Sequence, residues 1–247
     1  MNDAKQATPP PQDAPRGCPL RSTGDLNYVW EWNTPEEMQM QLAGYQPREE
    51  YLQDRVDKVA LVVEQLGLGP ESEIFEIGSG EGIMAAGLAD RVRAVLCADV
   101  SRSFLDKARA TCEGRENVSY HHIENDFLEK LPTAAFDAGF SLNVFIHLNV
   151  FEVFLYFRQI RRILRPGGLF CFNFLDLGDN TRGFFHTYAE RYRDANPVEF
   201  KGFLNWHGVE LMTGIAAEAG LTPLTDKMIN HDGVVFLTLR SDGEPAA

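Results

Sequence analysis

Short apolar runs that alternate with amphipathic segments constrain the fold of this chain more than any other feature of its sequence. Strands that are apolar on both faces and joined by helices predict a parallel sheet covered on both sides. Right-handed crossovers between such strands give a doubly wound α/β fold. The runs expected to form strands are 74–77, 94–98, 118–123, 138–142 and 169–174. The segments expected to form the intervening helices are 83–91, 104–111 and 150–164.

Two further helices are expected before the first strand. Thr34 supplies a capping hydroxyl and Pro35 suits the first helical position, so one helix should begin there. A second helix is predicted over 47–66, and Gly67 should end it, because glycine readily takes the left-handed conformation found at helix ends. The residues expected along its apolar side are Tyr51, Val56, Val59, Ala60 and Val63.

The C-terminal part departs from the alternating pattern. A helix predicted over 209–219 is followed by extended runs at 221–229 and 234–239. Asp232-Gly233 between these runs is a hairpin signal, because both residue types tolerate the positive φ of a tight turn. The sheet is therefore expected to close with an antiparallel strand.

The composition is that of an ordinary globular protein, with 44% hydrophobic and 24% charged residues among 247. Residues 1–25 are polar and rich in proline, and they lack the apolar core of a signal peptide, so we expect a disordered tail. No apolar run approaches the roughly 20 residues that a helix needs to cross a bilayer. We therefore expect a cytoplasmic protein with no membrane partner, as a monomer or a homodimer.

The formal net charge of −13 argues against nucleic acid as a partner, because an acidic surface repels phosphate. The four cysteines are scattered and are predicted to be reduced thiols, and the histidines lack ligand spacing, so no metal site is expected. One basic cluster is interpreted as the solvated face and C-terminal end of a helix, where cations suit the helix dipole. It consists of Arg158, Arg161, Arg162 and Arg165.

A glycine-rich loop at 78–82 lies where the first strand should end and a helix begin. In open α/β sheets, ligands bind at this edge, and glycines let the backbone approach them closely. The dinucleotide fingerprint would need a glycine at the position of Ile83. Glu76 just before the loop suits a cationic ligand better than a pyrophosphate. Glu81 within the loop is interpreted as a first-turn helix acid.

Acidic residues also follow the second and third strands. Asp99 lies 23 residues after Glu76, where a carboxylate can accept hydrogen bonds from both ribose hydroxyls. Ser101 should cap the next helix. Asp126, followed by Phe127, can accept from an adenine amino group while the next backbone amide donates to the ring; the alternative is a capping role in its loop. Asp137, at a strand entry, is interpreted as a capping or turn residue.

Five motifs in order resemble the class I S-adenosylmethionine-dependent methyltransferase family of small-molecule type, over about residues 70 to 240. They are Glu76 with the glycine loop, Ala98-Asp99-Val100-Ser101, Asp126-Phe127, Phe136-Asp137 with the run to Leu142, and Leu164-Arg165-Pro166-Gly167-Gly168. The resemblance implies a Rossmann-like seven-stranded sheet of order 3-2-1-4-5-7-6 with its last strand antiparallel. It also implies S-adenosylmethionine as cofactor, S-adenosylhomocysteine as product, and no metal. The cofactor-binding residues it implies are Glu76, Gly78, Ser79, Gly80, Asp99, Val100, Asp126, Phe127 and Asn143.

His147 is the candidate general base. It lies in the segment that leaves the fourth strand, beside the expected sulfonium, and it titrates near neutral pH. A hydroxyl acceptor needs such a base, which favours O-methylation over N-methylation. A histidine that only packs or hydrogen-bonds at a helix start is an equally weighted alternative.

Aromatic residues are dense in two segments outside the shared fold, which suggests a lid over an apolar or aromatic acceptor. The alternative for each residue is packing against the sheet. The candidate substrate residues are Tyr28, Trp30, Trp32, Phe185, His186, Tyr188, Trp206 and His207. Residues 26–247 should form one domain, with a helical cap (26–69), a cofactor-binding core (70–177), a lid insertion (178–207) and a C-terminal helix and hairpin (208–240).

Three other functions remain open from the sequence. Methylation of a protein or peptide predicts an open groove where a small-molecule enzyme has a closed pocket. A non-catalytic module that only holds S-adenosylmethionine is disfavoured by the available His147. A nicotinamide-dependent oxidoreductase is disfavoured by Ile83 and by the acidic Glu76.

Overall fold

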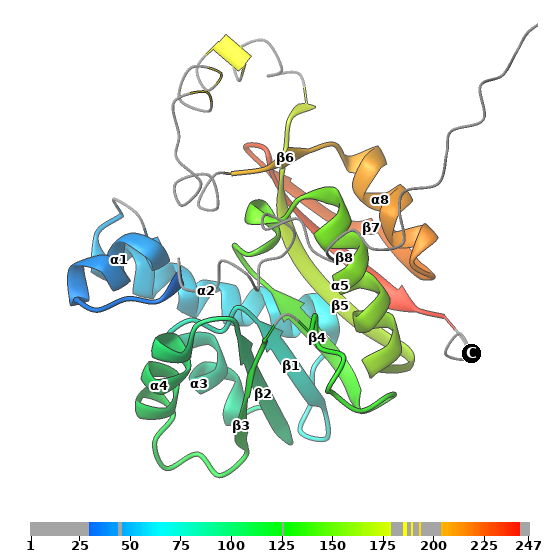
Figure 1. The fold of residues 1–247 in the computed structure, drawn as a ribbon. Helices are drawn as coiled ribbons and strands as arrows, with labels where there is room; N and C mark the ends of the chain where they lie inside the picture. Colours follow the sequence, from blue (N-terminus) through cyan, green and yellow to red (C-terminus); the bar gives the residue numbers. More distant parts are fainter. Residues whose placement is uncertain are drawn as a thin grey trace, which may run out of the picture.

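One twisted sheet with helices on both faces forms the centre of the molecule (Figure 1). The computed structural model describes residues 30–43, 46–124, 126–178 and 204–242, together with residues 185, 186, 189 and 193. The strand order is β3-β2-β1-β4-β5-β8-β7, and the short β6 pairs with β5 beside this path. When β6 is left out of the numbering, this is the expected order 3-2-1-4-5-7-6. The predicted fold class is confirmed.

The first five strands are parallel, and the C-terminal hairpin adds an antiparallel pair beside β5. The strands are β1 (Glu73–Ile77), β2 (Ala94–Asp99), β3 (Val118–His122), β4 (Phe136–Ser141), β5 (Leu164–Asp176), β6 (Trp206–His207), β7 (Leu221–His231) and β8 (Val234–Ser241). Asp232 and Gly233 join β7 to β8 with φ of 51° and 84°, which is the mirror-image turn that matches strand twist. The predicted antiparallel closure is therefore confirmed.

The helices divide between the two faces of the sheet. They are α1 (Pro35–Ala43), α2 (Arg48–Leu66), α3 (Ile83–Ala89), α4 (Arg102–Thr111), the 3₁₀ turn η2 (Phe145–His147), α5 (Val150–Ile163) and α8 (Val209–Glu218). Helices α2, α3 and α4 cover one face, while α5 and α8 cover the other. Gly67 ends α2 in the left-handed conformation, and the Ser101 side chain caps α4, as the sequence predicted.

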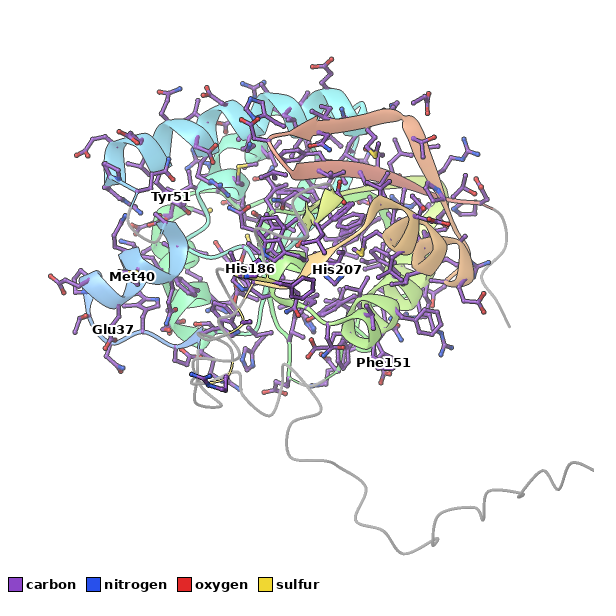
Figure 2. All side chains as sticks on the ribbon, turned by 90° about the horizontal axis from the view of Figure 1, so that it is seen from above. Glu37, Met40, Tyr51, Phe151, His186 and His207 are labelled. Atoms are coloured by element: carbon purple, nitrogen blue, oxygen red, sulfur yellow. The ribbon has the colours of Figure 1, made fainter. Side chains whose placement is uncertain are left out.

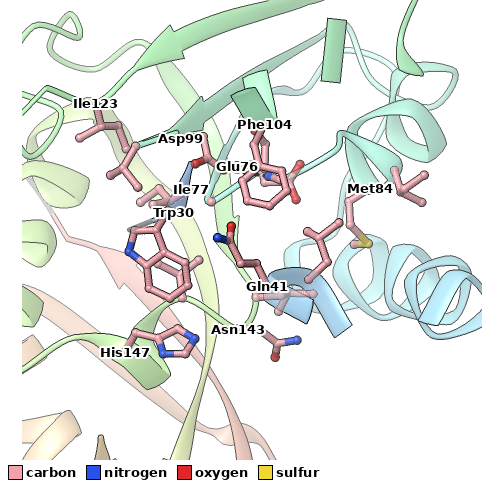
Figure 3. A pocket seen from close by; sticks show the side chains of 18 of the residues that line it. Trp30, Gln41, Glu76, Ile77, Met84, Asp99, Phe104, Ile123, Asn143 and His147 are labelled. Atoms are coloured by element: carbon pink, nitrogen blue, oxygen red, sulfur yellow. Dashed lines mark hydrogen bonds between the residues drawn. The ribbon is translucent and has the colours of Figure 1, made fainter. Parts of the chain in front are cut away.

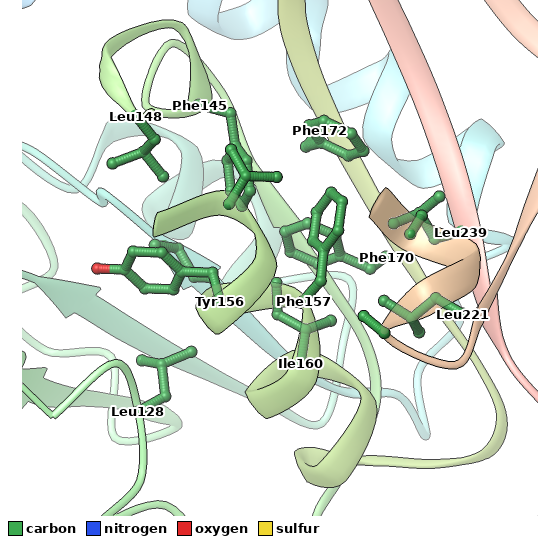
Figure 4. Close-up of a cluster of buried hydrophobic side chains, with 14 of the residues drawn as sticks. Leu128, Phe145, Leu148, Tyr156, Phe157, Ile160, Phe170, Phe172, Leu221 and Leu239 are labelled. Carbon is green, nitrogen blue, oxygen red and sulfur yellow. The ribbon is translucent and has the colours of Figure 1, made fainter. Parts of the chain in front are cut away.

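Each face of the sheet carries its own apolar core. On the α5 and α8 face, Phe170 and Phe172 of β5 stack with a centroid distance of 5.9 Å and contact Phe145 and Phe157 (Figure 4). Cys171, between them in sequence, belongs to the core of the opposite face. This alternation follows the two-residue repeat of a strand, so a strand that is apolar throughout can serve both cores.

The largest difference from the expected element bounds concerns β5. It begins at Leu164, not at 169, because Leu164 already pairs with Phe136 of β4. The ladder then shifts register and resumes with Leu169 opposite Ala138. The motif at residues 164–168, which precedes the expected strand, is therefore part of the strand and contains a bulge-like shift, which local turn signals do not distinguish from a loop.

The basic cluster at the end of α5 and the start of β5 is mostly engaged in structural bonds, which corrects the expectation of a solvated face. Arg162 donates to the carbonyl oxygens of Leu128 at 2.9 Å and Leu131 at 2.7 Å. Arg161 donates to the Gly220 carbonyl at 3.1 Å. Arg165 pairs with Glu73 and with Asp137, and Asp137 also accepts from the Glu73 backbone N–H at 2.8 Å. Asp137 therefore has the structural role that its strand-entry position predicted.

The short β6 returns the chain to the sheet beside the segment that follows β4. Trp206 and His207 pair in parallel with Leu175 and Asp176 at the end of β5. Just before β6, the Asn205 N–H donates to the Ile146 carbonyl at 2.6 Å. In the part of the chain that the structure describes, no helix has the length and apolar character to span a membrane.

Candidate active site

A cavity opens at the carboxyl ends of β1, β2 and β4, where successive crossovers leave β1 in opposite directions. This is the switch point at which open α/β sheets bind ligands. The segment before α1 and the helices α1 and α2 supply the remaining wall (Figure 3). The predicted site residues that line this cavity are Trp30, Glu76, Gly78, Ser79, Gly80, Asp99, Val100, Asn143 and His147.

The glycine loop brings its backbone to the floor of the cavity. Gly78 donates its N–H to the Ala98 carbonyl at 2.7 Å and adopts a φ of 73°. A Cβ atom at this position would collide with the side chain of Val144, which comes from the segment after β4. Both the positive φ and the contact require glycine here.

Asp99 at the end of β2 is 5% exposed and holds the loop from the side. Its two carboxylate oxygens accept from the backbone N–H groups of Gly80 at 2.8 Å and Ser101 at 2.9 Å. Burial raises the pKa of Asp99 to about 6, although these hydrogen bonds favour the charged form. Each oxygen keeps acceptor capacity toward the cavity. A pair of ribose hydroxyls fits this arrangement.

Glu76 and Arg55 place opposite charges in the same part of the cavity. Glu76 is 4% exposed, and its Oε2 atom has no hydrogen-bond partner among the residues that the structure describes. Burial raises the pKa of Glu76 well above its usual range, against the opposing effect of Arg55. Arg55 is itself 8% exposed. Arg55 already pairs with Asp54 at 2.6 Å, but its Nε atom has no hydrogen-bond partner among the described residues. An ammonium beside Glu76 would compensate the Glu76 carboxylate, and a carboxylate beside Arg55 would accept from this Nε atom, so the site fits an amino-acid zwitterion.

Helix α2 carries Arg55 into this position because it is fixed against the glycine loop. Arg48 in its first turn binds both carboxylate oxygens of Glu81, at 2.5 and 2.6 Å. Glu81 is 1% exposed, so the pair is partly shielded from water. Glu81 therefore anchors α2 through Arg48. It lies just before α3 and not in its first turn, where the sequence predicted it.

His147 ends the η2 turn on the opposite wall of the cavity. Its ring lies 4.9 Å from that of Trp30, with the planes tilted by 57° (Figure 3). Asn143, at the start of the same segment, also lines the cavity. The segment after β4 thus brings a titratable ring and polar backbone to the mouth of the site.

Asp126 and Phe127 are not among the residues that line the cavity. The Phe127 ring packs edge-on against Tyr156 at 5.1 Å. Asp126 is 9% exposed, and His121 Nε2 lies 3.7 Å from one of its carboxylate oxygens. Ile123, at the end of the same strand, is the residue that reaches the cavity from this side.

The predicted substrate residues scatter in the structure. Trp30 lines the cavity, but Trp32 packs against Phe104 at 6.2 Å and does not line it. His207 is buried, and its Nε2 atom lies 3.2 Å from the Leu148 carbonyl, so it ties β6 to the end of η2. Its neighbour Trp206 is half-buried and does not line the cavity either.

The remaining substrate candidates belong to the insertion and to the N-terminal segment. Phe185 and His186 are exposed, and neither lines the cavity. His186 is labelled in Figure 2. Tyr28 and Tyr188 lie outside the described residues, as does most of the expected lid over 178–207 and all of the expected tail over 1–25.

Sequence reasoning missed the contribution of the first two helices. Gln41 and Leu42 of α1, and Tyr51 and Arg55 of α2, line the cavity. A signal was present for Arg55, since it follows Tyr51 by four residues and so shares its helix face. A charged residue on the apolar side of a helix points to a buried polar site.

The N-terminal segment is fixed across the cavity by Glu31. Its carboxylate accepts from the backbone N–H groups of Arg102 at 2.6 Å and Ser103 at 2.9 Å, at the start of α4. Trp32 N–H donates to the Ser103 hydroxyl at 3.1 Å. These bonds hold Trp30 over the site. Among the described residues, no group of three or more potential ligands could hold a metal ion.

The fold and the site define an α/β domain whose cavity fits a nucleoside carrying an amino-acid group. Consistent with this class, residues 75–172 match the family model described as a methyltransferase domain. Demethylmenaquinone methyltransferase of Tropheryma whipplei is 30% identical over 103 residues, which are 42% of this chain and 41% of that protein. The match therefore spans about two fifths of the relative's length.

Solved methyltransferase structures share the fold. A putative methyltransferase from Bacillus halodurans superposes with a TM-score of 0.60 at 16% identity, covering 76% of this chain and all of the other. Magnesium protoporphyrin IX methyltransferase from Synechocystis superposes with a TM-score of 0.60 at 15% sequence identity, covering 90% of this chain and 96% of the other. Geranyl diphosphate C-methyltransferase from Streptomyces coelicolor superposes with a TM-score of 0.59 at 14% sequence identity, covering 82% of this chain and 86% of the other. This chain thus shares the fold of these methyltransferases, and its residues 75–172 are similar to a methyltransferase domain.

Proposed function

We propose that the protein transfers a methyl group from S-adenosylmethionine to a small-molecule acceptor. The observation that carries this proposal is the presence of Asp99, Glu76 and Arg55 in one cavity, opposite His147. These groups complement the ribose, the ammonium and the carboxylate of the cofactor in turn. A nicotinamide dinucleotide has no ammonium for Glu76, and its pyrophosphate would meet a buried carboxylate.

The chain's contribution to methyl transfer is mainly orientation. When bound, the sulfonium supplies an electrophilic methyl group for in-line displacement. Asp99 and the glycine loop hold the nucleoside, and Glu76 and Arg55 hold the amino-acid end, so that the methyl group has one direction of approach. Such positioning is worth roughly 7–11 kcal/mol of a reaction barrier. Trp30 and the tethered N-terminal segment keep water from that face of the cavity.

We propose His147 as the general base for a hydroxyl acceptor. It lines the cavity on the wall opposite the helices α1 and α2, at the end of the segment that begins with Asn143. A base in this place takes the hydroxyl proton as the oxygen attacks, which contributes about 10²–10⁴-fold. Trp30 beside its ring offers a flat apolar surface to an aromatic acceptor.

A second candidate acceptor comes from the relative that acts, by its name, on demethylmenaquinone. In its reduced, quinol form such a ring carries hydroxyl groups and can be methylated on carbon. His147 would take the hydroxyl proton as the ring carbon attacks the methyl group, and loss of the proton from that carbon would restore the aromatic ring and its hydroxyl. N-methylation and methylation of a peptide would need no such base. Retention of S-adenosylmethionine without turnover would identify a binding module.

The first experiment is calorimetric titration of the purified protein with S-adenosylmethionine and S-adenosylhomocysteine, with NAD as the control. Saturable binding of the two sulfur nucleosides at a 1:1 ratio, without binding of NAD, is the expected result. Transfer of radiolabelled methyl is then measured with phenols, quinols, amines and peptides. Binding of NAD, or of none of the three, would overturn the proposal.

A further inference from the structure

The side chains of Asn143 and Asn173 form a reciprocal pair behind the cavity. The Asn143 backbone N–H donates to Asn173 Oδ1 at 2.6 Å, and Asn173 Nδ2 donates to Asn143 Oδ1 at 2.9 Å. Asn173 is only 2% exposed and lies on β5, flanked by residues of the apolar core. A buried amide on a central strand is costly unless it is hydrogen-bonded, so this pairing specifies how the segment after β4 must lie.

Asn143 has a backbone conformation that needs such support. Its φ is 61°, in the left-handed region that residues other than glycine seldom adopt. Asparagine tolerates this region better than most residues, and the two bonds to Asn173 hold it there. The observed backbone is thus set by a side chain thirty positions away, on the neighbouring strand.

This conformation determines where the rest of the segment goes. Directly after Asn143, Val144 packs on Gly78 so closely that no other residue fits at position 78. The η2 turn then starts and presents His147 to the cavity. On the other side, Ser141 donates its hydroxyl to the Ile77 carbonyl at 2.9 Å and joins the ends of β4 and β1. The start of the segment 142–147 is therefore held by two contacts, that of Ser141 with Ile77 and that of Asn143 with Asn173.

We propose that Asn173 is a positioning residue for methyl transfer: through Asn143 it sets the backbone of 142–147 and thereby the place of His147. The proposal rests on the function proposed above. Any buried hydrogen bond contributes to stability, but the proposed role of Asn173 is more specific. The Asn143–Asn173 pair holds Asn143 at positive φ, and Asn143 lies between the glycine loop and His147.

A purely structural role predicts a different outcome, and the chain offers a matched control. Thr238 on β8 is fully buried, and its hydroxyl donates to Gln65 Oε1 at 2.9 Å. Neither residue lines the cavity. Thr238→Val removes the buried hydrogen bonds of this hydroxyl, to Gln65 and to Cys171, on a strand that does not pair with β4. It therefore measures what the loss of such bonds does to stability alone.

The test compares kcat, KM and melting temperature for Asn173→Ala, Asn173→Asp and Thr238→Val. We expect Asn173→Ala to lower kcat at least tenfold, with a fall in melting temperature similar to that of Thr238→Val, which keeps its kcat. Asn173→Asp retains an acceptor for the Asn143 N–H and should keep more activity than alanine. If the Asn173 variants lose only melting temperature, or if aspartate is no better than alanine, the proposal is wrong.

A double variant gives a second, independent readout. Asn143→Gly lets position 143 adopt positive φ without help from Asn173, so Asn173→Ala combined with Asn143→Gly should recover at least threefold in kcat over Asn173→Ala. A strictly additive loss would contradict the proposal. S-adenosylhomocysteine binding by the wild-type protein is measured alongside. Its absence would reject the proposed function itself, whereas binding and turnover without the Asn173 effect would reject only this inference.

Discussion

At the scale of single residues, Asp99 shows how burial and hydrogen bonding compete in the site. Burial favours the neutral carboxyl, whereas N–H donors from Gly80 and Ser101 favour the carboxylate, and the pKa comes to about 6. Two ribose hydroxyls would donate to the carboxylate and stabilise the charged form further. Ligand affinity is thereby linked to protonation.

We expect the affinity for S-adenosylhomocysteine to fall as the pH drops below about 6, approaching tenfold per pH unit. The sign follows because the ribose binds the ionised form of Asp99, which protonation removes. Glu76, whose pKa is also raised, adds to the effect in the same direction. Calorimetry between pH 5 and 8 measures it. Asp99→Asn should bind weakly and lose much of the pH dependence, and constant wild-type affinity over this range would refute the ribose role.

His147 is the residue that separates chemistry from binding. We expect His147→Ala to lower turnover at least tenfold and to leave S-adenosylhomocysteine affinity within about threefold, since the imidazole faces the acceptor side of the cavity. Single-turnover rates and calorimetry give the two quantities. Trp30→Phe serves as the control for the ring contact between these residues. Unchanged turnover in His147→Ala would leave His147 as a packing residue.

At the scale of elements, the site depends on how α4 and the N-terminal segment meet. The Glu31 carboxylate accepts two backbone N–H groups at the start of α4, where a helix also favours negative charge. Burial opposes its ionisation, but hydrogen bonds from Ser103 and Arg102 outweigh burial and lower the pKa of Glu31. The N-terminal segment is thus held over the site by an electrostatic contact, beside the ring contacts of Trp30 and Trp32.

Glu31→Gln should loosen this contact at a cost of about 1 kcal/mol, the usual value of a charge at a helix start. Hydrogen–deuterium exchange should increase in residues 30–43 and at the start of α4, and S-adenosylhomocysteine affinity should fall. Glu36→Gln, an exposed acidic residue of α1, is the matched control. Equal exchange in both variants would show that the tether does not hold the segment.

At the scale of the whole molecule, the cavity lies at an edge of the sheet between the two apolar cores. On one face it is lined by α2 with Arg55, and on the other by the segment after β4. A ligand bound there contacts elements of both faces. Binding should therefore stabilise the domain as a unit and not one layer of it.

We expect S-adenosylhomocysteine at 100 times its Kd to add about 2.7 kcal/mol to the free energy of unfolding. For a domain of this size that corresponds to a rise in melting temperature of roughly 5–10 °C. Thermal unfolding followed by circular dichroism checks it, with NAD at the same concentration as the control. A shift confined to fluorescence of the tryptophans, without a change in the circular dichroism transition, would indicate local ordering only.

Most of the fold could be predicted because it depends on local patterns. The apolar runs gave the parallel strands, and Asp232-Gly233 gave the hairpin, since strand repeat and turn geometry are properties of neighbouring residues. The start of β5 was misplaced, because whether Leu164 pairs with Phe136 depends on a partner strand. Local turn signals cannot report that pairing.

The site residues also fall into those that local patterns predict and those that they do not. Glu76, Asp99 and the glycine loop come at strand ends, and the switch point brings strand ends together whatever the side chains are. On α2, Val56 is 60% exposed while Arg55 is 8% exposed, which reverses their expected places. Hydropathy ranks valine as the buried residue, but the polar cavity beneath α2 accepts a guanidinium.

The sequence by itself determined the parallel strands, the antiparallel closure, the place of the cavity and the carboxylates at its edge, because these follow from local periodicity and topology. The strand order followed from the resemblance to methyltransferases. Only the tertiary structure decided which other residues join these carboxylates. Arg55 lies beside Glu76, which is 21 residues away along the chain. The Glu31 tether reaches Ser103 over 72 residues, and the Asn143–Asn173 pair spans thirty. Such contacts arise when whole helices and strands pack together. No local sequence pattern encodes which distant residues this packing brings into contact.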